Sequence, residues 1–324
     1  FRSLPHTYVN ESEIIMTQSA RQREKSTTVR TEKRNRERII RARRKRANQA
    51  ARIVSWLSDK RPVETAQLAE LLWSLPRRSE RPGREVTWLD SGISQSVPSG
   101  MGNLKAWVWG TGPTVLLVHG WDGRGSQLGA FIKPLVDSGH RVVTFDSRGH
   151  GDSFGKRASL VSFADAVTAM ARHFGPLHGI IAHSFGAAGT MYALRSGLHV
   201  PRVVFLGPVN ARHGADRFAR FLKISPECAD IFKGQVEKRM GHTFEILKGT
   251  ALQNEIRPDL LIYHDEEDLF VPITDAEEIT LKWPEAKLVK TKGLGHHRIL
   301  RDPNIIDASI EFFMGTSSKQ TVAA

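Results

Sequence analysis

Short apolar segments alternate with stretches of helical periodicity from about residue 104 onward. The segment LKAWVWG (104–110) alternates between apolar and polar positions, as a half-buried strand does. Later segments are nearly continuous apolar runs, several of them rich in β-branched residues: 114–120, 141–147, 178–184, 202–208, 259–266 and 286–293. Helical stretches separate most of them: 127–138, 160–174, 186–197, 274–283 and 303–314. This alternation predicts an α/β fold with a mostly parallel, doubly wound sheet covered by helices on both faces.

The stretch from about residue 209 to 256 interrupts this alternation. It contains helix-like pieces, ADRFARFLK and CADIFKGQVEKRM, but no apolar run that could form a central strand. We therefore expect an insertion at 209–256 that forms a small helical cap.

The sequence predicts a partly helical N-terminal extension, 1–80, and a main domain, 81–324. Between about residues 50 and 75, apolar residues recur at helical spacing on either side of Pro62, which predicts two helices that pack on the main domain. Residues 76–100 contain three prolines and several Gly and Ser residues, which predicts a linker followed by an edge strand. Residues 1–15 precede the first methionine, and we expect them to derive from upstream sequence or a fusion.

The net charge of +13 belongs almost entirely to the N-terminal extension. Residues 1–61 hold 17 Lys and Arg against 6 Asp and Glu, whereas the remaining residues hold 30 against 28. Within the extension, 21–46 is dense in charge and poor in apolar residues. This segment is either a solvated helix or an arm that binds a polyanion, such as a nucleic acid or an anionic surface. Aromatic residues that could stack on bases are absent from 21–46, and no nucleic-acid-binding motif accompanies it.

Several classes of protein are excluded by the composition. No apolar run approaches the roughly 18 to 20 residues that span a bilayer, so no membrane span is expected. The single cysteine, Cys228, rules out an internal disulfide, and the scattered histidines form no spaced ligand set. No metal or other cofactor is therefore expected. Because no apolar segment of a secretory signal follows the basic residues, we expect a cytoplasmic, bacterial protein.

The segment AHSFG, 182–186, ends a predicted strand on a serine flanked by small residues. A strand-to-helix turn that is tight enough to display Ser184 forces it into a strained backbone conformation, so small residues are needed two positions away on each side. Ala182 and Gly186 meet this requirement. The N-terminus of the following helix would favour negative charge developing near the serine. The segment therefore predicts a nucleophile elbow.

A serine hydroxyl needs a base to take its proton, and the base needs a carboxylate to orient it. GLGHHRIL places His296, and next to it His297, directly after the last predicted strand. The preceding strand ends in an acidic cluster, Asp265, Glu266, Glu267 and Asp268. The carboxyl ends of parallel strands lie at one edge of a sheet, so these groups are expected to meet Ser184 there.

With these motifs the sequence resembles the α/β-hydrolase family over roughly residues 100–315. The chain order of serine, acid and histidine is that family's order. Short motifs agree with it: HGW (119–121), DSRGHGDS (146–153), DEEDLFVP (265–272) and GLGH (293–296). The family's acid motif places the acid at Asp268, with Asp265 at the position of a usual glycine and as the alternative acid. The histidine motif favours His296 over His297, and Ala182 replaces the first glycine of the common elbow.

The resemblance implies a serine hydrolase that cleaves carboxylic esters, with short to medium acyl chains expected. Ser184 would be the nucleophile, His296 the base and Asp268 the acid, and backbone N–H groups of Trp121 and Phe185 would form the oxyanion hole. A thioesterase, lactonase or acyltransferase could use the same triad. A different hypothesis is a binding protein that uses the basic arm.

Four cap residues, together with Ile231, are expected to line an apolar acyl pocket: Phe218, Phe221, Leu222 and Phe232. The same pattern would also arise if these residues only packed the cap helices onto the main domain.

Overall fold

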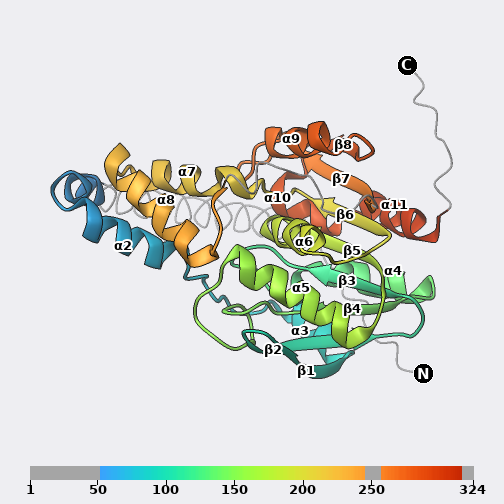
Figure 1. Ribbon diagram of the computed structural model, residues 1–324. Coiled ribbons are helices and arrows are strands. Elements are labelled where there is room, and N and C mark those ends of the chain that lie inside the picture. Colours follow the sequence, from blue (N-terminus) through green and yellow to red (C-terminus); the bar gives the residue numbers. More distant parts are fainter. Residues whose placement is uncertain (1–51, 245–256, 316–324) are drawn as a thin grey trace, which may run out of the picture.

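The computed structural model describes residues 52–244 and 257–315. The basic segment 21–46 and the last part of the predicted cap lie outside the described residues. An eight-stranded sheet forms the centre of the molecule, in the order β1-β2-β4-β3-β5-β6-β7-β8 (Figure 1). The strands are β1 (Ile93–Ser99), β2 (Gly102–Trp109), β3 (Thr114–Val118), β4 (Arg141–Phe145), β5 (Leu177–His183), β6 (Arg202–Leu206), β7 (Asp259–Asp265) and β8 (Lys287–Thr291).

The sheet is parallel from β4 to β8, and only the β1–β2 and β2–β4 pairs are antiparallel. Central strands bury both faces, which explains their continuous apolar runs. In β3, Leu116 packs into one core cluster and Leu117 into the other. The predicted α/β fold with a mostly parallel sheet is confirmed.

Helices cover both faces of this sheet. The first cluster packs beneath α5 (Leu160–Phe174), α6 (Phe185–Arg195) and α9 (Thr274–Lys282). The second packs beneath the short helices η1 (Gly125–Phe131), α4 (Ile132–Asp137) and η3 (Ile299–Arg301), together with α11 (Pro303–Met314). The four-residue helix α10 (Gly295–Arg298) follows β8. None of the helices within the described ranges is long and apolar enough to cross a membrane.

The segment 76–100 differs in part from its prediction. The edge strand is present as β1, but residues predicted as linker form the helix α3 (Gly83–Asp90). Its sequence, GREVTWLD, combines a glycine with β-branched residues and gives no helical signal by itself. Tertiary contacts stabilise it, because Leu89 packs into the second core cluster and Glu85 is buried in an ion pair with Arg124.

The cap contains a helix from the N-terminal extension. Figure 1 shows α7 (Ala211–Leu222), α8 (Pro226–Met240) and α2 (Pro62–Trp73) extending as an arm from the body, and these three helices are called the cap below. They share a small core: Ala66, Ala69, Ala215, Ala219, Cys228, Phe232 and Val236. Residues 62–73, which the sequence assigned to the extension, thus pack with the predicted insertion.

Candidate active site

Ser184 lies at a strained turn between β5 and α6. Its backbone has φ 52° and ψ −119°, a conformation that costs a non-glycine residue about 1–3 kcal/mol. The surroundings hold it there. The Ser184 N–H donates to the Leu206 carbonyl oxygen at 3.0 Å. At Gly186 a Cβ atom would lie 2.3 Å from the carbonyl oxygen of His119, so only glycine fits. The turn has the geometry of a nucleophile elbow.

His296 connects the serine to a carboxylate. Its Nε2 atom lies 3.0 Å from Ser184 Oγ, and its Nδ1 atom lies 2.6 Å from Asp268 Oδ2. With a carboxylate at Nδ1, the ring carries its proton there and leaves Nε2 free to accept from the serine hydroxyl. The three residues follow β5, β7 and β8, so the parallel sheet brings them together at the carboxyl ends of its strands.

Asp268 is held as an anion by its hydrogen bonds. Its Oδ1 accepts from the backbone N–H groups of Phe270 and Val271 at 2.8 and 3.0 Å. Burial acts to raise the pKa of Asp268. The hydrogen bond and charge of His296, with the two backbone donors, outweigh that effect and hold the pKa below its usual value.

Asp265 and His297, the alternative acid and base, do not join this arrangement. Asp265 Oδ2 accepts from Thr291 Oγ1 at 2.8 Å and from the Leu294 N–H at 2.9 Å, so this carboxylate orders the loop that leads to His296. The side chain of His297 points to the surface, and its ring centre lies 5.2 Å from that of His296.

The two predicted oxyanion donors flank the serine. Phe185 is the first residue of α6, where backbone N–H groups have no partner within the helix. Trp121 follows Gly120, and a Cβ atom at Gly120 would lie only 2.9 Å from Ser184 Cβ. The backbone of this loop therefore passes directly beside Ser184. The rings of Trp121 and Phe185 meet edge to face with centroids 5.1 Å apart.

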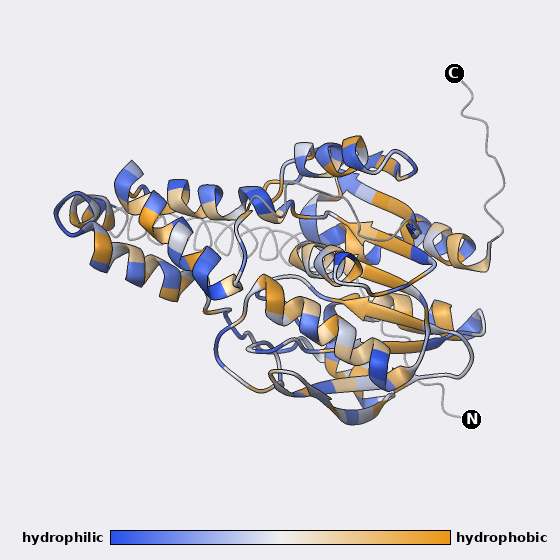
Figure 2. Ribbon diagram, viewed as in Figure 1, coloured by the Kyte–Doolittle hydropathy of each residue, from blue (hydrophilic) through white to orange (hydrophobic). Residues whose placement is uncertain are grey.

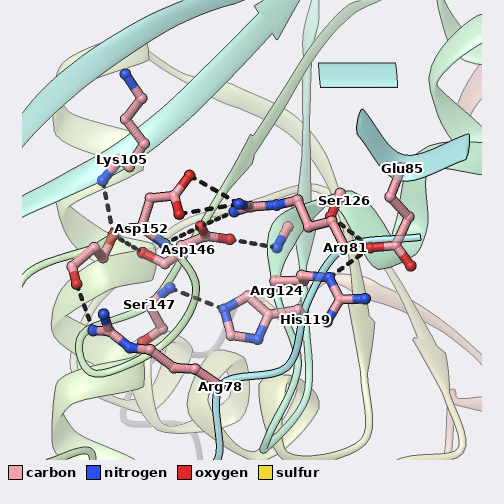
Figure 3. Close-up of polar contacts among 12 residues, drawn as sticks. Arg78, Arg81, Glu85, Lys105, His119, Arg124, Ser126, Asp146, Ser147 and Asp152 are labelled. Carbon is pink, nitrogen blue, oxygen red and sulfur yellow. Dashed lines mark hydrogen bonds and ion pairs between the residues drawn. The ribbon is translucent and has the colours of Figure 1, made fainter. Parts of the chain in front are cut away.

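The side chain of His119 supports the loop that contains Trp121. Its Nε2 accepts from the Ser147 N–H at 2.9 Å (Figure 3), so its proton lies on Nδ1, which donates to the Gly120 carbonyl oxygen at 2.7 Å. Burial lowers the pKa of His119 to about 4, which keeps the ring neutral at physiological pH. His119 is thus a structural support of the loop.

The DSRGHGDS loop is fixed by a buried carboxylate and an arginine from the N-terminal segment. Asp146 accepts from the backbone N–H groups of Gly125 and Asp152, each at 2.8 Å. Arg81 bridges Asp146 and Asp152 (Figure 3) at 2.8 and 2.9 Å. Burial raises the pKa of Asp146 in spite of these partners. These contacts hold the loop in place, and neither aspartate has a hydrogen bond to Ser184, His296 or Asp268 among the contacts described above.

A second buried ion pair lies beside the first. Arg124 Nε contacts Glu85 Oε2 at 2.6 Å, and the same oxygen accepts from Ser126 Oγ at 2.7 Å (Figure 3). Arg78 donates to the backbone carbonyl oxygens of Gly149, Ser153 and Gly155. The sequence analysis missed Arg78, Arg81 and Glu85, because charged residues in a proline-rich stretch are typical of an exposed linker.

A cavity of about 420 Å³ opens beside Ser184. Its walls are mainly apolar, and Trp73, Trp121 and Phe185 lie among them. Of the predicted pocket residues, Phe218 and Phe221 line it. Phe232 is instead fully buried in the cap core, and Leu222 packs against the same core, because both face into the cap.

Trp73 is a wall residue that the sequence analysis did not identify. It comes from α2, and its ring packs edge to face on Phe218 with centroids 5.1 Å apart. Helical periodicity around Pro62 indicated a packed helix, but no local sequence pattern indicated that this helix lies beside Ser184. Within the described ranges no group of three or more His, Cys, Asp or Glu residues could hold a metal ion.

Comparisons with known proteins agree with this architecture. Residues 113–228 match the family described as alpha/beta hydrolase fold. A non-heme haloperoxidase of Rhodococcus erythropolis is 31% identical over 119 residues, which are 36% of this chain and 38% of that protein. The proline iminopeptidase PfmaB of Pestalotiopsis fici is 33% identical over 108 residues, or 31% of this chain and 38% of that protein. The chain thus spans well under half the length of these relatives.

Solved structures extend the likeness over most of the fold. A putative lipase of Acinetobacter baumannii superposes with a TM-score of 0.55 at 16% identity, over 73% of this chain and 95% of that one. An esterase of Pyrococcus furiosus gives a TM-score of 0.54 at 18% identity, over 75% and 97% of the two chains. The strand order and these matches define an α/β-hydrolase fold. Residues 113–228 therefore resemble that family in sequence as well as in fold.

Proposed function

We propose that the protein is a serine hydrolase of carboxylic esters. The observation that carries the proposal is the hydrogen-bonded series Asp268–His296–Ser184, with the serine on a strained turn in the wall of a mainly apolar cavity. A serine that only packs or forms hydrogen bonds does not require a strained backbone. A nucleophilic serine must be exposed to the substrate and must lie beside a base that takes its proton.

In the acylation step, Ser184 Oγ attacks the ester carbonyl carbon while its proton passes to His296 Nε2. The oxyanion that forms is stabilised by the backbone N–H groups of Phe185 and Trp121. Asp268 keeps the imidazole in the Nδ1-protonated form and stabilises its positive charge. The C–O bond to the alcohol then breaks, and His296 gives its proton to the leaving alkoxide, which leaves an acyl group on Ser184.

Deacylation repeats these roles with water. His296 takes a proton from water, the hydroxide attacks the acyl carbon, and Ser184 leaves with the returned proton. The cavity supports an acyl group of modest size, since its volume lies within the usual range of small-molecule sites, about 300–1,000 Å³. No step requires a metal or an organic cofactor.

The test combines a p-nitrophenyl ester series, from acetate to palmitate, with active-site labelling. Wild type should hydrolyse short or medium esters, and Ser184→Ala should reduce kcat to background. A fluorophosphonate should label wild type at Ser184, as located by peptide mass spectrometry. Labelling at Ser184 without turnover of any p-nitrophenyl ester would support Ser184 as the nucleophile but reject these esters as the substrate class. Acyl thioesters and lactones would then be assayed. Absence of labelling and of turnover would reject the triad.

A further inference from the structure

Helix α2 is packed with its leucines outward. Its buried face consists of small or polar residues, including Ala66, Ala69 and Glu70, whereas Leu68, Leu71 and Leu72 are 45%, 40% and 47% exposed. A helix on a water-soluble protein normally buries its leucines and exposes its charges. Leaving several leucines in water forgoes the favourable free energy that burial of their apolar surface would provide.

This orientation is fixed by specific contacts of the opposite face. Glu70 lies in the interior and forms ion pairs with Arg157, at 2.7 Å, and with Arg239 of α8. Trp73 packs among Trp121, Phe218 and Phe232. A rotation of α2 that buried the leucines would expel both residues from their partners. The contacts of Glu70 and Trp73 therefore keep the leucines of α2 exposed.

Further apolar side chains are exposed on the segments next to α2. Toward the N-terminus, Ile53 and Trp56 are exposed on the helical residues 52–60, which are joined to the start of α8 by hydrogen bonds between Ser58 and Ser225. Toward the active site, Phe221 is 71% exposed and lines the cavity together with Leu72. Figure 2 shows hydrophobic positions along α2 on the arm. We call the exposed apolar side chains Ile53, Trp56, Val63, Leu68, Leu71, Leu72 and Leu75, with Phe221, the apolar face.

Cations accompany the apolar face. The side chains of Arg61 and Arg77 are largely exposed, and they form ion pairs with Glu64 and Asp122 at 3.3 Å each. Such exposed pairs contribute little and are readily exchanged for other anions. In the sequence, the segment 21–46, which holds 13 Lys and Arg against 3 Glu, ends shortly before Ile53. An apolar surface and a strongly basic segment therefore adjoin in sequence.

We propose that the apolar face and the adjoining basic segment dock the protein on an anionic lipid surface. Amphipathic helices bind bilayers by burying apolar side chains at the level of the headgroups, and each nearby Lys or Arg strengthens the attraction to an anionic leaflet. A nucleic acid would neutralise the cations but leave the leucines in water. A second copy of the chain would cover the leucines but bring two segments of like charge together.

Docking in this way would place the mouth of the cavity at the lipid surface, because Leu72 and Phe221 belong both to the apolar face and to the cavity wall. This consequence rests on the proposed function, since it makes lipid-dissolved esters the substrates. The docking itself does not depend on catalysis.

The test is co-sedimentation of the full chain with vesicles, using the Ser184→Ala variant so that no lipid is hydrolysed. One set of vesicles is phosphatidylcholine alone, and the other contains about one third phosphatidylglycerol. We expect binding to the anionic vesicles that weakens between about 0.1 M and 0.5 M salt, and at least tenfold weaker binding to the neutral ones. The double variant Leu68→Ser/Leu71→Ser should bind the anionic vesicles at least tenfold more weakly.

Matched variants make the result specific. Leu281→Ser removes an equally large apolar side chain that is 80% exposed on α9, outside the apolar face, and should bind as the parent does. In the otherwise wild-type chain, Leu68→Ser/Leu71→Ser should keep full activity on p-nitrophenyl acetate, which shows that the fold is intact. Replacement of Arg43, Arg44, Lys45 and Arg46 by Gln should weaken binding to the anionic vesicles. The remaining binding should depend less on the salt concentration.

The proposal is overturned if neither kind of vesicle binds, or if Leu68→Ser/Leu71→Ser binds as well as Leu281→Ser. It is also overturned if the chain forms a dimer that the leucine substitutions dissociate, since the apolar face would then be occupied by a second copy. Salt-dependent binding to a DNA duplex that exceeds binding to anionic vesicles would assign the basic segment to nucleic acid instead. If the wild type binds anionic vesicles but hydrolyses no ester, only the proposed function is rejected.

Discussion

The indole ring of Trp73 stacks on that of Trp121, with centroids 6.4 Å apart and planes inclined by 24°. Trp73 ends a helix of the N-terminal segment, and Trp121 lies in the loop beside Ser184. A second link follows closely, because the Arg77 N–H donates to Asp122 Oδ1 at 2.7 Å, and Asp122 has a strained φ of 56°. The N-terminal segment thus restrains the loop that carries a proposed oxyanion donor.

Removal of this stack should impair catalysis without unfolding the protein. We expect Trp73→Ala to lower kcat/KM for a short p-nitrophenyl ester by about tenfold or more, since misplacement of a catalytic group by about 1 Å can cost 10²-fold. Trp73→Phe should restore most of the loss. Trp56→Ala is the control, because Trp56 is exposed and does not line the cavity. Equal activity of Trp73→Ala and Trp56→Ala would show that the stack has no catalytic role.

The choice between the two acids can be tested by a pair of amide substitutions. Asp268→Asn should lower kcat by about 10⁴-fold, because the amide cannot hold His296 as the required tautomer. Asp265→Asn should chiefly lower the thermal midpoint, since its carboxylate accepts from Thr291 and Leu294. Ester hydrolysis and thermal unfolding are measured on both. A greater loss of kcat in Asp265→Asn would reverse the assignment.

Glycine is required at the elbow but not in the cap. Gly186→Ala should destabilise the protein or prevent folding, since the new Cβ would lie 2.3 Å from the His119 carbonyl oxygen. Gly234→Ala is the matched control in α8, where a Cβ meets nothing within 4 Å. That change should raise the free energy of unfolding by about 0.5–1 kcal/mol, because alanine is the better helix former. Denaturant unfolding measures both, and similar values would contradict the strained-turn interpretation.

The ion pair between Glu85 and Arg124 should matter far more than a surface pair. Both side chains are buried, so Glu85→Gln leaves the Arg124 guanidinium without its counter-charge and should cost about 3–5 kcal/mol. Asp137→Asn breaks the exposed pair with Lys133 and should leave the free energy of unfolding unchanged within error. Chemical denaturation provides the comparison. A small effect of Glu85→Gln would mean that α3 contributes little to the position of the Ser126 loop.

Stability should fall in mild acid because of buried neutral histidines. The pKa of His119 is lowered to about 4 in the folded protein, against 6.5 as its ordinary value. Between these values the unfolded chain takes up a proton that the folded one does not. The contribution of His119 is therefore complete above about pH 6.5 and is lost toward pH 4, at about 1.4 kcal/mol per pH unit. His150, whose pKa burial lowers to about 3, acts in the same direction.

The measurement is the free energy of unfolding at several pH values between 4 and 7 in wild type and His119→Gln. The variant should be less stable at neutral pH, but its stability should depend less steeply on pH, by about one proton. Identical slopes in the two proteins would show that His119 is not the group that titrates.

The central α/β architecture and the candidate triad were predictable because their signals are local. Continuous apolar runs indicate strands that are buried on both faces, and a small–x–Ser–x–Gly segment after such a run indicates a tight turn. Since parallel strands end at one edge, Ser184, Asp268 and His296 could be expected to meet there without any knowledge of the packing. The α3 helix could not be predicted, because its stability comes from the buried Glu85 and Leu89 contacts and not from its own residues.

Only the tertiary structure decided which distant segments complete the site. No local pattern shows that Trp73 reaches the cavity or that Arg81 binds Asp146, because these contacts depend on how α2 and residues 77–82 run over the body. The same holds for Phe232, which a sequence cannot separate from Phe218, since an apolar residue on a cap helix faces either the cavity or the cap core. Which leucines of α2 face water was likewise settled by the ion pairs of Glu70, a contact between residues far apart in the chain.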